Sequence, residues 1–185
     1  MDIKKTMNVK TGIDGVVGFD YDVISDNRGN IVEVYRKTDF PFPYEFSCWP
    51  QQMTHTRSNP GVLRGLHGQG WNRVIYPVNG KILQVFVDLR EKSSTFGKVV
   101  TEVIEDSNRK AFFVPAYVAN GYAILGDNPV DYLYIIDGYY DGKDTINIAY
   151  NDPDLKINWQ IKNPIISKKD KNNSTMRELF PKEYR

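Results

Sequence analysis

The chain has few of the residues that bind metals or form disulfides. Its 185 residues include one cysteine, Cys48, and two histidines, His55 and His67. One cysteine cannot form an internal disulfide, which favours a reducing compartment, so we predict a cytoplasmic protein. A metal-binding barrel usually gathers three nitrogen ligands and a carboxylate, and two histidines cannot supply them. We therefore expect no metal ion.

Long apolar runs, glycine-rich phosphate loops and an excess of one charge are also missing. No stretch approaches the ~18 apolar residues of a membrane span, and no apolar run follows Met1–Thr6, so we expect neither a membrane segment nor a secretory signal. There is no GxGxxG or Walker-type motif, which argues against hydride transfer and ATP use. With 24 basic and 23 acidic residues, the chain has no electrostatic footprint for nucleic acid.

Short strands dominate what is present. Hydrophobic residues make up 41% and aromatic residues 13%, which predicts one folded domain over residues 1–185. A spacing of about 8 to 12 residues per strand favours a sandwich or barrel. Asn79-Gly80 lies between two strand patterns and predicts a hairpin. Short helices are expected only over residues 40–47 and 174–179. The predicted strands are Ile31–Tyr35, Val74–Val78, Lys81–Asp88, Val99–Ile104, Lys110–Val114, Gly121–Leu125 and Asp131–Ile136.

One segment, Gly61–Gln69, places a cation and a titratable ring in an apolar strand. Arg64 and His67 are costly to bury unless each has a partner or a task. One interpretation is a strand-end histidine whose ring bonds a backbone carbonyl. The other is a functional histidine.

Ordered sequence blocks decide between these interpretations, because together they resemble the dTDP-4-dehydrorhamnose 3,5-epimerase family from about Tyr21 to Asp170. The Ala119–Tyr122 block corresponds to A-H-G-F in the family. The blocks, in chain order, are Asp26–Gly29 with Glu33, Gln52–Ser58, Gly61–Gln69, Val87–Arg90 with Ser94–Gly97, Val114–Tyr122, Tyr134 with Tyr139-Tyr140, Asn151–Trp159, and Ser167–Asp170.

The resemblance implies an all-β fold, a cupin-like jelly-roll sandwich or barrel with short helices at its periphery and C-terminus. It implies a cofactor-independent epimerase of nucleotide-linked 4-keto-6-deoxy sugars, serving surface polysaccharide synthesis such as capsule or lipopolysaccharide. The C4 ketone acidifies the C3 and C5 hydrogens. Such a site needs a base, an acid across the ring and a cation near the enolate oxygen.

Four residues match the family's catalytic positions. His67 is the implied base, and Asp170 is the carboxylate that orients it. From the residues alone, Lys168–Lys171 is typical of a solvated charged loop. Tyr134 matches the proton donor, although its segment is also typical of an ordinary aromatic strand. Arg73 stands where relatives carry a lysine that polarises the ketone, and otherwise predicts a surface charge at a strand end.

Further residues match substrate-binding positions. Arg28 and Arg64 are implied to hold the pyrophosphate, for which a guanidinium fork is suited. Glu33, Gln52 and Thr54 match nucleotide-contacting positions. Because the early arginine and glutamate of relatives reach across a subunit interface, the resemblance also implies a homodimer.

The chain departs from the family pattern at Gln84, Asn120, Arg73 and Gly68, where relatives have aspartate, histidine, lysine and an aromatic residue. We expect all four to line or adjoin the sugar pocket, with Gln84 and Asn120 binding substrate. Relatives that act on GDP-linked 4-keto heptoses share several of these features. The nucleotide can therefore be dTDP, GDP or another, the sugar a hexose or a heptose, and the enzyme restricted to C3 or C5.

Three other hypotheses stay open. A 3,4-ketoisomerase shares the fold and a base histidine, but the segment from Asn151 to Asp170 is typical of the epimerases. A non-catalytic binding jelly roll would keep Arg28 and Arg64 without needing His67 and Tyr134. A metal-dependent cupin is the weakest alternative because ligands are lacking.

Overall fold

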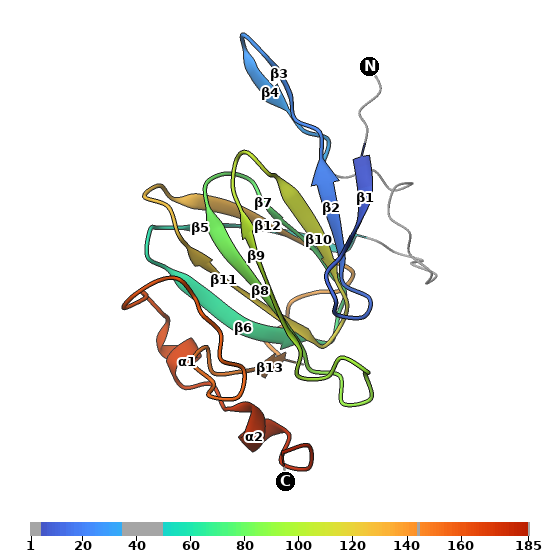
Figure 1. Cartoon of the computed structure of the whole chain (residues 1–185), viewed down its shortest axis with the longest axis vertical. Helices are drawn as coiled ribbons and strands as arrows, with labels where there is room; N and C mark the ends of the chain where they lie inside the picture. The colour runs from blue at the N-terminus through green and yellow to red at the C-terminus, as the bar shows by residue number, and fades with distance from the viewer. Residues whose placement is uncertain (1–4, 35–49, 144, 185) are drawn as a thin grey trace.

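Two antiparallel sheets packed face to face make up the body of the computed structural model, which describes residues 5–34, 50–143 and 145–184 (Figure 1). This jelly-roll sandwich confirms the predicted all-β class. The helix expected over residues 40–47, and Cys48, lie outside the described residues.

Strands distant in sequence are neighbours in both sheets. The six-stranded sheet has the order β1 (Lys5–Lys10), β2 (Val17–Tyr21), β10 (Lys110–Val114), β7 (Arg73–Pro77), β12 (Val130–Ile136), β5 (Gln52–Ser58). The five-stranded sheet has the order β13 (Thr145–Asn147), β6 (Leu63–Gln69), β11 (Val118–Ile124), β8 (Ile82–Asp88), β9 (Val99–Ile104). Six of the seven predicted strands lie within a few residues of β7 to β12.

Alternation along the strands gives each sheet an inner and an outer face. On β12, Tyr132 and Tyr134 pack into the core between the sheets, whereas Leu133 and Ile135 belong to an outer cluster. The strand neighbours of Tyr134 are Thr54 on β5 and Ile75 on β7. Tyr134 therefore lies on the inner face of the six-stranded sheet, between β5 and β7.

The C-terminal segment covers the outer face of the five-stranded sheet. It carries α1 (Lys168–Lys171) and α2 (Met176–Leu179), and Trp159 and Met176 are buried against that sheet. Asp152 fixes α2, since its carboxylate accepts a 2.6 Å hydrogen bond from the Met176 backbone. Thr175 and Glu178 form a capping box at the start of α2. The helix expected over residues 174–179 is confirmed, and the segment holds α1 next to β6.

The Asn79-Gly80 hairpin prediction is wrong. β7 and β8 lie in different sheets, so these two residues join the sheets rather than two paired strands. The Asn79 side chain instead accepts a 2.7 Å hydrogen bond from the Asp131 backbone. Gly80 has a φ of +77°, and a Cβ there would lie 2.7 Å from a Val130 methyl. Asn79 and Gly80 therefore form a turn that crosses from one sheet to the other, and the hydrogen bond to Asp131 attaches this turn to the start of β12.

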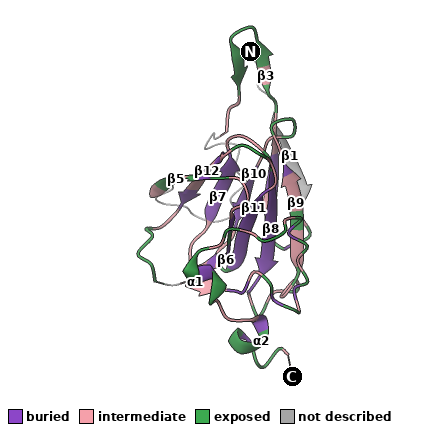
Figure 2. Cartoon of the chain, turned by 90° about the vertical axis from the view of Figure 1, so that its left-hand side faces the viewer, coloured by how far each residue is buried: buried purple, intermediate pink, exposed green. Residues whose placement is uncertain are grey.

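The strand predicted over Ile31–Tyr35 is also wrong in its position. β4 (Gly29–Ile31) ends where that prediction begins, and it pairs with β3 (Ile24–Asp26) through a turn at Asn27-Arg28. Tyr35 lies outside the described residues. The β3–β4 hairpin projects away from the two sheets, and its strands are almost entirely exposed (Figures 1 and 2).

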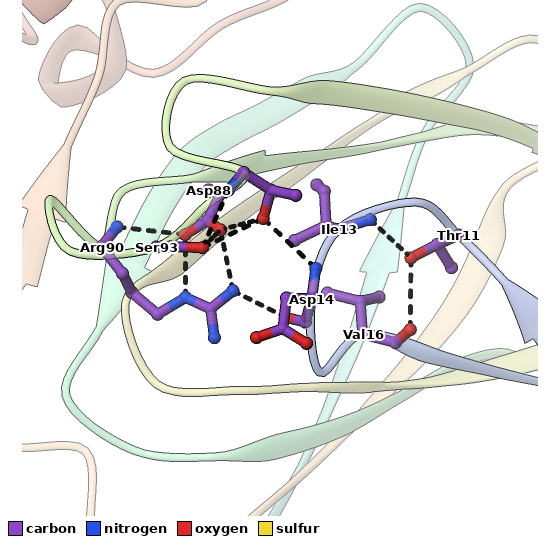
Figure 3. Close-up of polar contacts among 8 residues, drawn as sticks. Thr11, Ile13, Asp14, Val16, Asp88, Arg90 and Ser93 are labelled. Atoms are coloured by element: carbon purple, nitrogen blue, oxygen red, sulfur yellow. Dashed lines mark hydrogen bonds and ion pairs between the residues drawn. The ribbon is translucent and has the colours of Figure 1, made fainter.

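A buried carboxylate ties the β8–β9 loop to the β1–β2 loop (Figure 3). Asp88 has no exposed side-chain surface, and it accepts hydrogen bonds from Arg90, Ser93 and Thr95. Burial opposes the charge on Asp88, but these donors prevail and lower its pKa to about 2. Arg90 and Thr95 also bond the backbone of Asp14, which closes the network across the two loops.

Candidate active site

β6 forms one wall of a cavity of about 450 Å³, to which Leu63, Arg64, His67 and Gln69 contribute. Gly65 lets β6 approach β11 closely: its φ is +122°, and a Cβ there would lie 2.6 Å from the Cα of Gly121. His67 pairs with Asn120 of β11 on one side and with Asn147 of β13 on the other. The residues that line the cavity beside β6 include Tyr140, Thr145, Asn147, Ile165, Ile166, Ser167, Lys169 and Asp170.

His67 has a carboxylate partner rather than a backbone carbonyl. Its Nε2 lies 2.8 Å from Oδ1 of Asp170, and the ring remains about one-third exposed while Asp170 is 4% exposed. Burial opposes ionisation of Asp170, but the hydrogen bond and charge of His67 outweigh it and lower the Asp170 pKa. An ionised carboxylate only accepts, so Nε2–H donates and the lone pair of the neutral ring is left on Nδ1.

Asp170 is not in the solvated loop that the charges of Lys168–Lys171 indicate. The four residues form α1, capped by the Ser167 hydroxyl, which accepts from the Asp170 backbone at 3.0 Å. The lysines are exposed, whereas Asp170 turns inward to His67 and the Gly65 backbone. Local composition could not indicate this, because the partner lies 103 residues away.

Arg73 is buried, at 1% exposure, so the alternative of a surface charge is wrong. Its Nε donates to Oδ1 of Asn120 at 2.8 Å, and one Nη donates to the Val118 carbonyl. Within the described part of the chain, the other Nη has no hydrogen-bond partner. Burial lowers the pKa of Arg73 to about 10 against the opposing effect of Tyr132 and Tyr134, so it stays cationic at neutral pH.

Tyr134 lies on β12, half-buried on the inner face of the opposite sheet. Burial raises the pKa of its phenol well above the ordinary value, as does Tyr122, while the charges of Arg64 and Arg73 oppose this rise. The phenol is therefore neutral at physiological pH and able to donate a proton. Arg73 connects the two sheets. It donates a hydrogen bond to Asn120 beside His67, and its charge acts to lower the pKa of Tyr134.

Gln84 and Gly68 are placed differently from the expectation. Gln84 is fully buried, donates to the Gly121 carbonyl at 3.0 Å, and accepts from the Tyr132 hydroxyl at 2.7 Å. It thus supports the inner core, and like Arg73, Asn120 and Tyr134 it is not among the residues that line the cavity. A Cβ on Gly68 would meet Leu89 at 2.8 Å, so this position faces the outer cluster rather than the sugar pocket.

The predicted substrate-binding residues fall into two groups. Arg64 lines the cavity, and Gln52 and Thr54 lie on β5, where their side chains bond each other at 2.9 Å. Gln52 also accepts from the Tyr140 backbone. Arg28 instead lies on the projecting β3–β4 hairpin and pairs with Asp26, and Glu33 follows that hairpin. The structure does not bring this second group to the cavity.

A set of hydroxyl groups behind the cavity escaped the sequence predictions. Arg64 Nε donates to Ser58 Oγ at 2.8 Å, and Ser58 Oγ lies 3.1 Å from the Tyr122 hydroxyl. Thr56 Oγ1 lies 3.2 Å from the same hydroxyl. The available signal was Tyr122 itself, a tyrosine at the phenylalanine of the A-H-G-F block.

Neither a metal-binding group nor a membrane-spanning helix occurs among the described residues. No group of three or more His, Cys, Asp or Glu side chains there could hold a metal ion. Within the same residues, every helix is too short or too polar to cross a membrane.

Comparisons with known proteins agree over nearly the whole chain. The family described as dTDP-4-dehydrorhamnose 3,5-epimerase matches residues 10–178. The dTDP-4-dehydrorhamnose 3,5-epimerase of Shigella flexneri is 32% identical over 171 residues, 90% of this chain and 94% of that protein. RmlC from Streptococcus suis, solved in complex with dTDP-D-xylose, has a TM-score of 0.84 and 33% identity, covering 96% of this chain and 94% of that one. A double mutant of ChmJ, a 3'-monoepimerase from Streptomyces bikiniensis solved in complex with dTDP, has a TM-score of 0.80 and 26% identity, covering 91% and 88%.

Proposed function

The chain belongs to the dTDP-4-dehydrorhamnose 3,5-epimerase family, and from this premise we propose that it inverts C3, C5 or both in a nucleotide-linked 4-keto-6-deoxy sugar. We further propose that residues 1–185 form one cytoplasmic epimerase domain whose product enters surface polysaccharide synthesis. The reaction needs no redox change, because a proton leaves one face of the carbon and another returns on the opposite face.

His67 is the proposed base. With Nε2–H bound to Asp170, the lone pair on Nδ1 accepts the proton from the carbon next to the ketone. The electron pair of the broken C–H bond moves into the enolate, and the ring becomes an imidazolium. The buried, ionised Asp170 stabilises that charge at 2.8 Å and keeps the ring in one tautomer.

Arg73 and Tyr134 serve the enolate from the other sheet. The Arg73 Nη without a partner among the described residues is a fixed donor for the enolate oxygen, in a buried setting where such donors are most effective. Tyr134, neutral because its pKa is raised, returns a proton to the carbon on the face opposite His67. The resulting phenolate lies close enough to Arg64 and Arg73 for both cations to stabilise it.

The nucleotide end of the substrate is assigned to the mouth of the cavity. Arg64 is suited to a diphosphate, since its guanidinium lies at the cavity and forms one hydrogen bond to Ser58. We assign Gln52 and Thr54 on β5 to the nucleoside end of the substrate. Arg28 lies on the projecting β3–β4 hairpin and Glu33 follows it, so we propose that they make their predicted contacts across the interface of a homodimer.

The observation that carries this function is the pairing of His67 with the buried Asp170 beside a cavity. Arg73 is connected to this pair through Asn120, the strand partner of His67, and the charges of Arg64 and Arg73 act on Tyr134. A non-catalytic sugar-nucleotide-binding protein would need Arg64 but not a buried carboxylate on its histidine. A 3,4-ketoisomerase stays an alternative that the reaction products would reveal.

The experiment is proton NMR in heavy water containing a chelator, with 4-keto-6-deoxy sugars carried on dTDP and on GDP. We expect deuterium at C3, C5 or both, together with the inverted sugar, and the preferred nucleotide shows the faster exchange. Exchange at C3 alone would make the protein a monoepimerase, as ChmJ is described. Absence of exchange with every substrate, with binding retained, would favour the binding protein, and migration of the ketone would favour the isomerase.

A further inference from the structure

His67 lies between two asparagines on the inner face of the five-stranded sheet. Asn120 of β11 is its strand partner on one side, and Asn147 of β13 is its strand partner on the other. Residues directly opposite each other on antiparallel strands project to the same face, with Cβ atoms about 4.5–5.5 Å apart. The three side chains therefore form one row across the sheet, with the proposed base at its centre.

The two asparagines differ in what they leave free for a ligand. Asn120 is 4% exposed, its Oδ1 accepts from Nε of Arg73 at 2.8 Å, and it does not line the cavity. Asn147 is half-buried and lines the cavity, and its Nδ2 donates to Thr145 Oγ1 at 3.3 Å. Among the described residues, no group donates a hydrogen bond to Oδ1 of Asn147. Asn147, rather than Asn120, is therefore the amide acceptor that a bound sugar can reach.

The order of the row determines which part of the sugar lies beside Asn147. The C4 ketone is assigned to Arg73, and Arg73 meets this sheet at Asn120. When His67 removes the C3 proton, C4 lies toward Asn120, so C2, the carbon on the other side of C3, lies toward Asn147. Neighbouring strands are about 4.8 Å apart, a separation that the amide side chain and a hydroxyl on C2 can span together.

We propose that Asn147 is a specificity-determining residue whose amide oxygen accepts a hydrogen bond from the C2 hydroxyl of the sugar. This inference rests on the proposed function and extends it to substrate choice: the protein selects 4-keto-6-deoxy sugars that have a hydroxyl at C2 over their 2-deoxy analogues. Thr145 holds the amide in place through its hydrogen bond to Nδ2. Because water can solvate the half-buried oxygen when the hydroxyl is missing, the preference corresponds to one neutral hydrogen bond, about tenfold.

The test uses two compounds that carry the same nucleotide and differ only at C2: a 4-keto-6-deoxy sugar and its 2-deoxy analogue. The kcat/KM for deuterium incorporation at C3 is measured by proton NMR for wild type, Asn147→Ala and Asn128→Ala. Asn128 is a matched control, since it is an exposed asparagine between β11 and β12 that does not line the cavity. Wild type and Asn128→Ala should prefer the 2-hydroxy compound about tenfold. Asn147→Ala should show little preference, because only its rate with the 2-hydroxy compound falls, whereas a structural defect would lower both rates.

Several results would overturn the inference while the proposed function stands: no preference in wild type, an unchanged preference in Asn147→Ala, or equal slowing of that variant on both compounds. Exchange at C5 alone would do the same, because the neighbours of C5 other than C4 are the ring oxygen and C6.

Calorimetry with the same two compounds covers the opposite case, in which wild type binds both but exchanges neither. The proposed function then fails, and the ratio of the two Kd values tests Asn147 by itself. A ratio of about ten in wild type that falls to near one in Asn147→Ala supports the contact, and an unchanged ratio refutes it. Absence of binding of both compounds would overturn the contact and the proposed function together.

Discussion

Replacement of Asp170 by asparagine tests how much the carboxylate contributes to the proposed base. The asparagine side chain has the same shape, and its amide oxygen still accepts from Nε2–H of His67, so the ring orientation persists while the negative charge is lost. A hydrogen bond to a charged group contributes roughly 1.5–3 kcal/mol, and Asp170 is buried enough for that range to apply. Because about 1.4 kcal/mol is a factor of ten, we expect C3 exchange in Asp170→Asn to slow by roughly 10- to 150-fold.

The chain contains a matched control for this variant. His55 Nε2 lies 2.9 Å from Asp131, nearly the same contact as in the His67 pair, but the His55 side chain is 57% exposed and lies outside the cavity. Asp131→Asn should therefore leave exchange at the wild-type rate. The assay is the initial rate of deuterium incorporation by proton NMR at saturating substrate, with the thermal midpoint of each variant recorded. Asp170→Asn within twofold of wild type, or an equal loss in Asp131→Asn, would refute the assignment.

Two further outcomes are expected. Tyr134→Phe should exchange deuterium without producing inverted sugar, because His67 still forms the enolate and proton return from the opposite face is lost; equal loss of exchange and inversion would point to a different role, such as base at C5. Asp88 has its pKa lowered to about 2 from an ordinary 3.8, so it contributes about 2 kcal/mol to stability above pH ~4, and that contribution is lost as the pH falls toward 2. Urea unfolding between pH 7 and 3 should show about half of this loss in wild type and none of it in Asp88→Asn; parallel pH dependences would contradict it.

Local sequence patterns predicted the strands well and their partners poorly. The segments of β7 to β12 are rich in β-branched and aromatic residues, and alternation of burial fixes which face each side chain occupies. Pairing depends on contacts between distant segments. Asn79-Gly80 has the residues of a hairpin turn, but β7 pairs with β10 and β12, so the turn crosses between sheets.

In the candidate site, too, local sequence predicted some residues, whereas contacts between distant segments placed the others. The apolar strand around Arg64 and His67 marked the β6 segment from the residues alone, although the structure leaves Arg64 exposed and the His67 ring about one-third exposed. Asp170 and Arg73 looked like surface charges, and only ordered motifs shared with a family indicated otherwise. Their burial follows from the C-terminal segment folding onto β6 and from Asn120 lying opposite Arg73. No local pattern encodes either contact.

The measurement that tests the account most directly is deuterium incorporation at C3 and C5 by wild type and by His67→Asn, on one 4-keto-6-deoxy sugar nucleotide. Binding of the same compound is measured in parallel by calorimetry. We expect wild type to exchange, and His67→Asn to bind with similar affinity but to exchange several orders of magnitude more slowly. Near-normal exchange by His67→Asn would contradict the assignment of the base and with it the proposed mechanism.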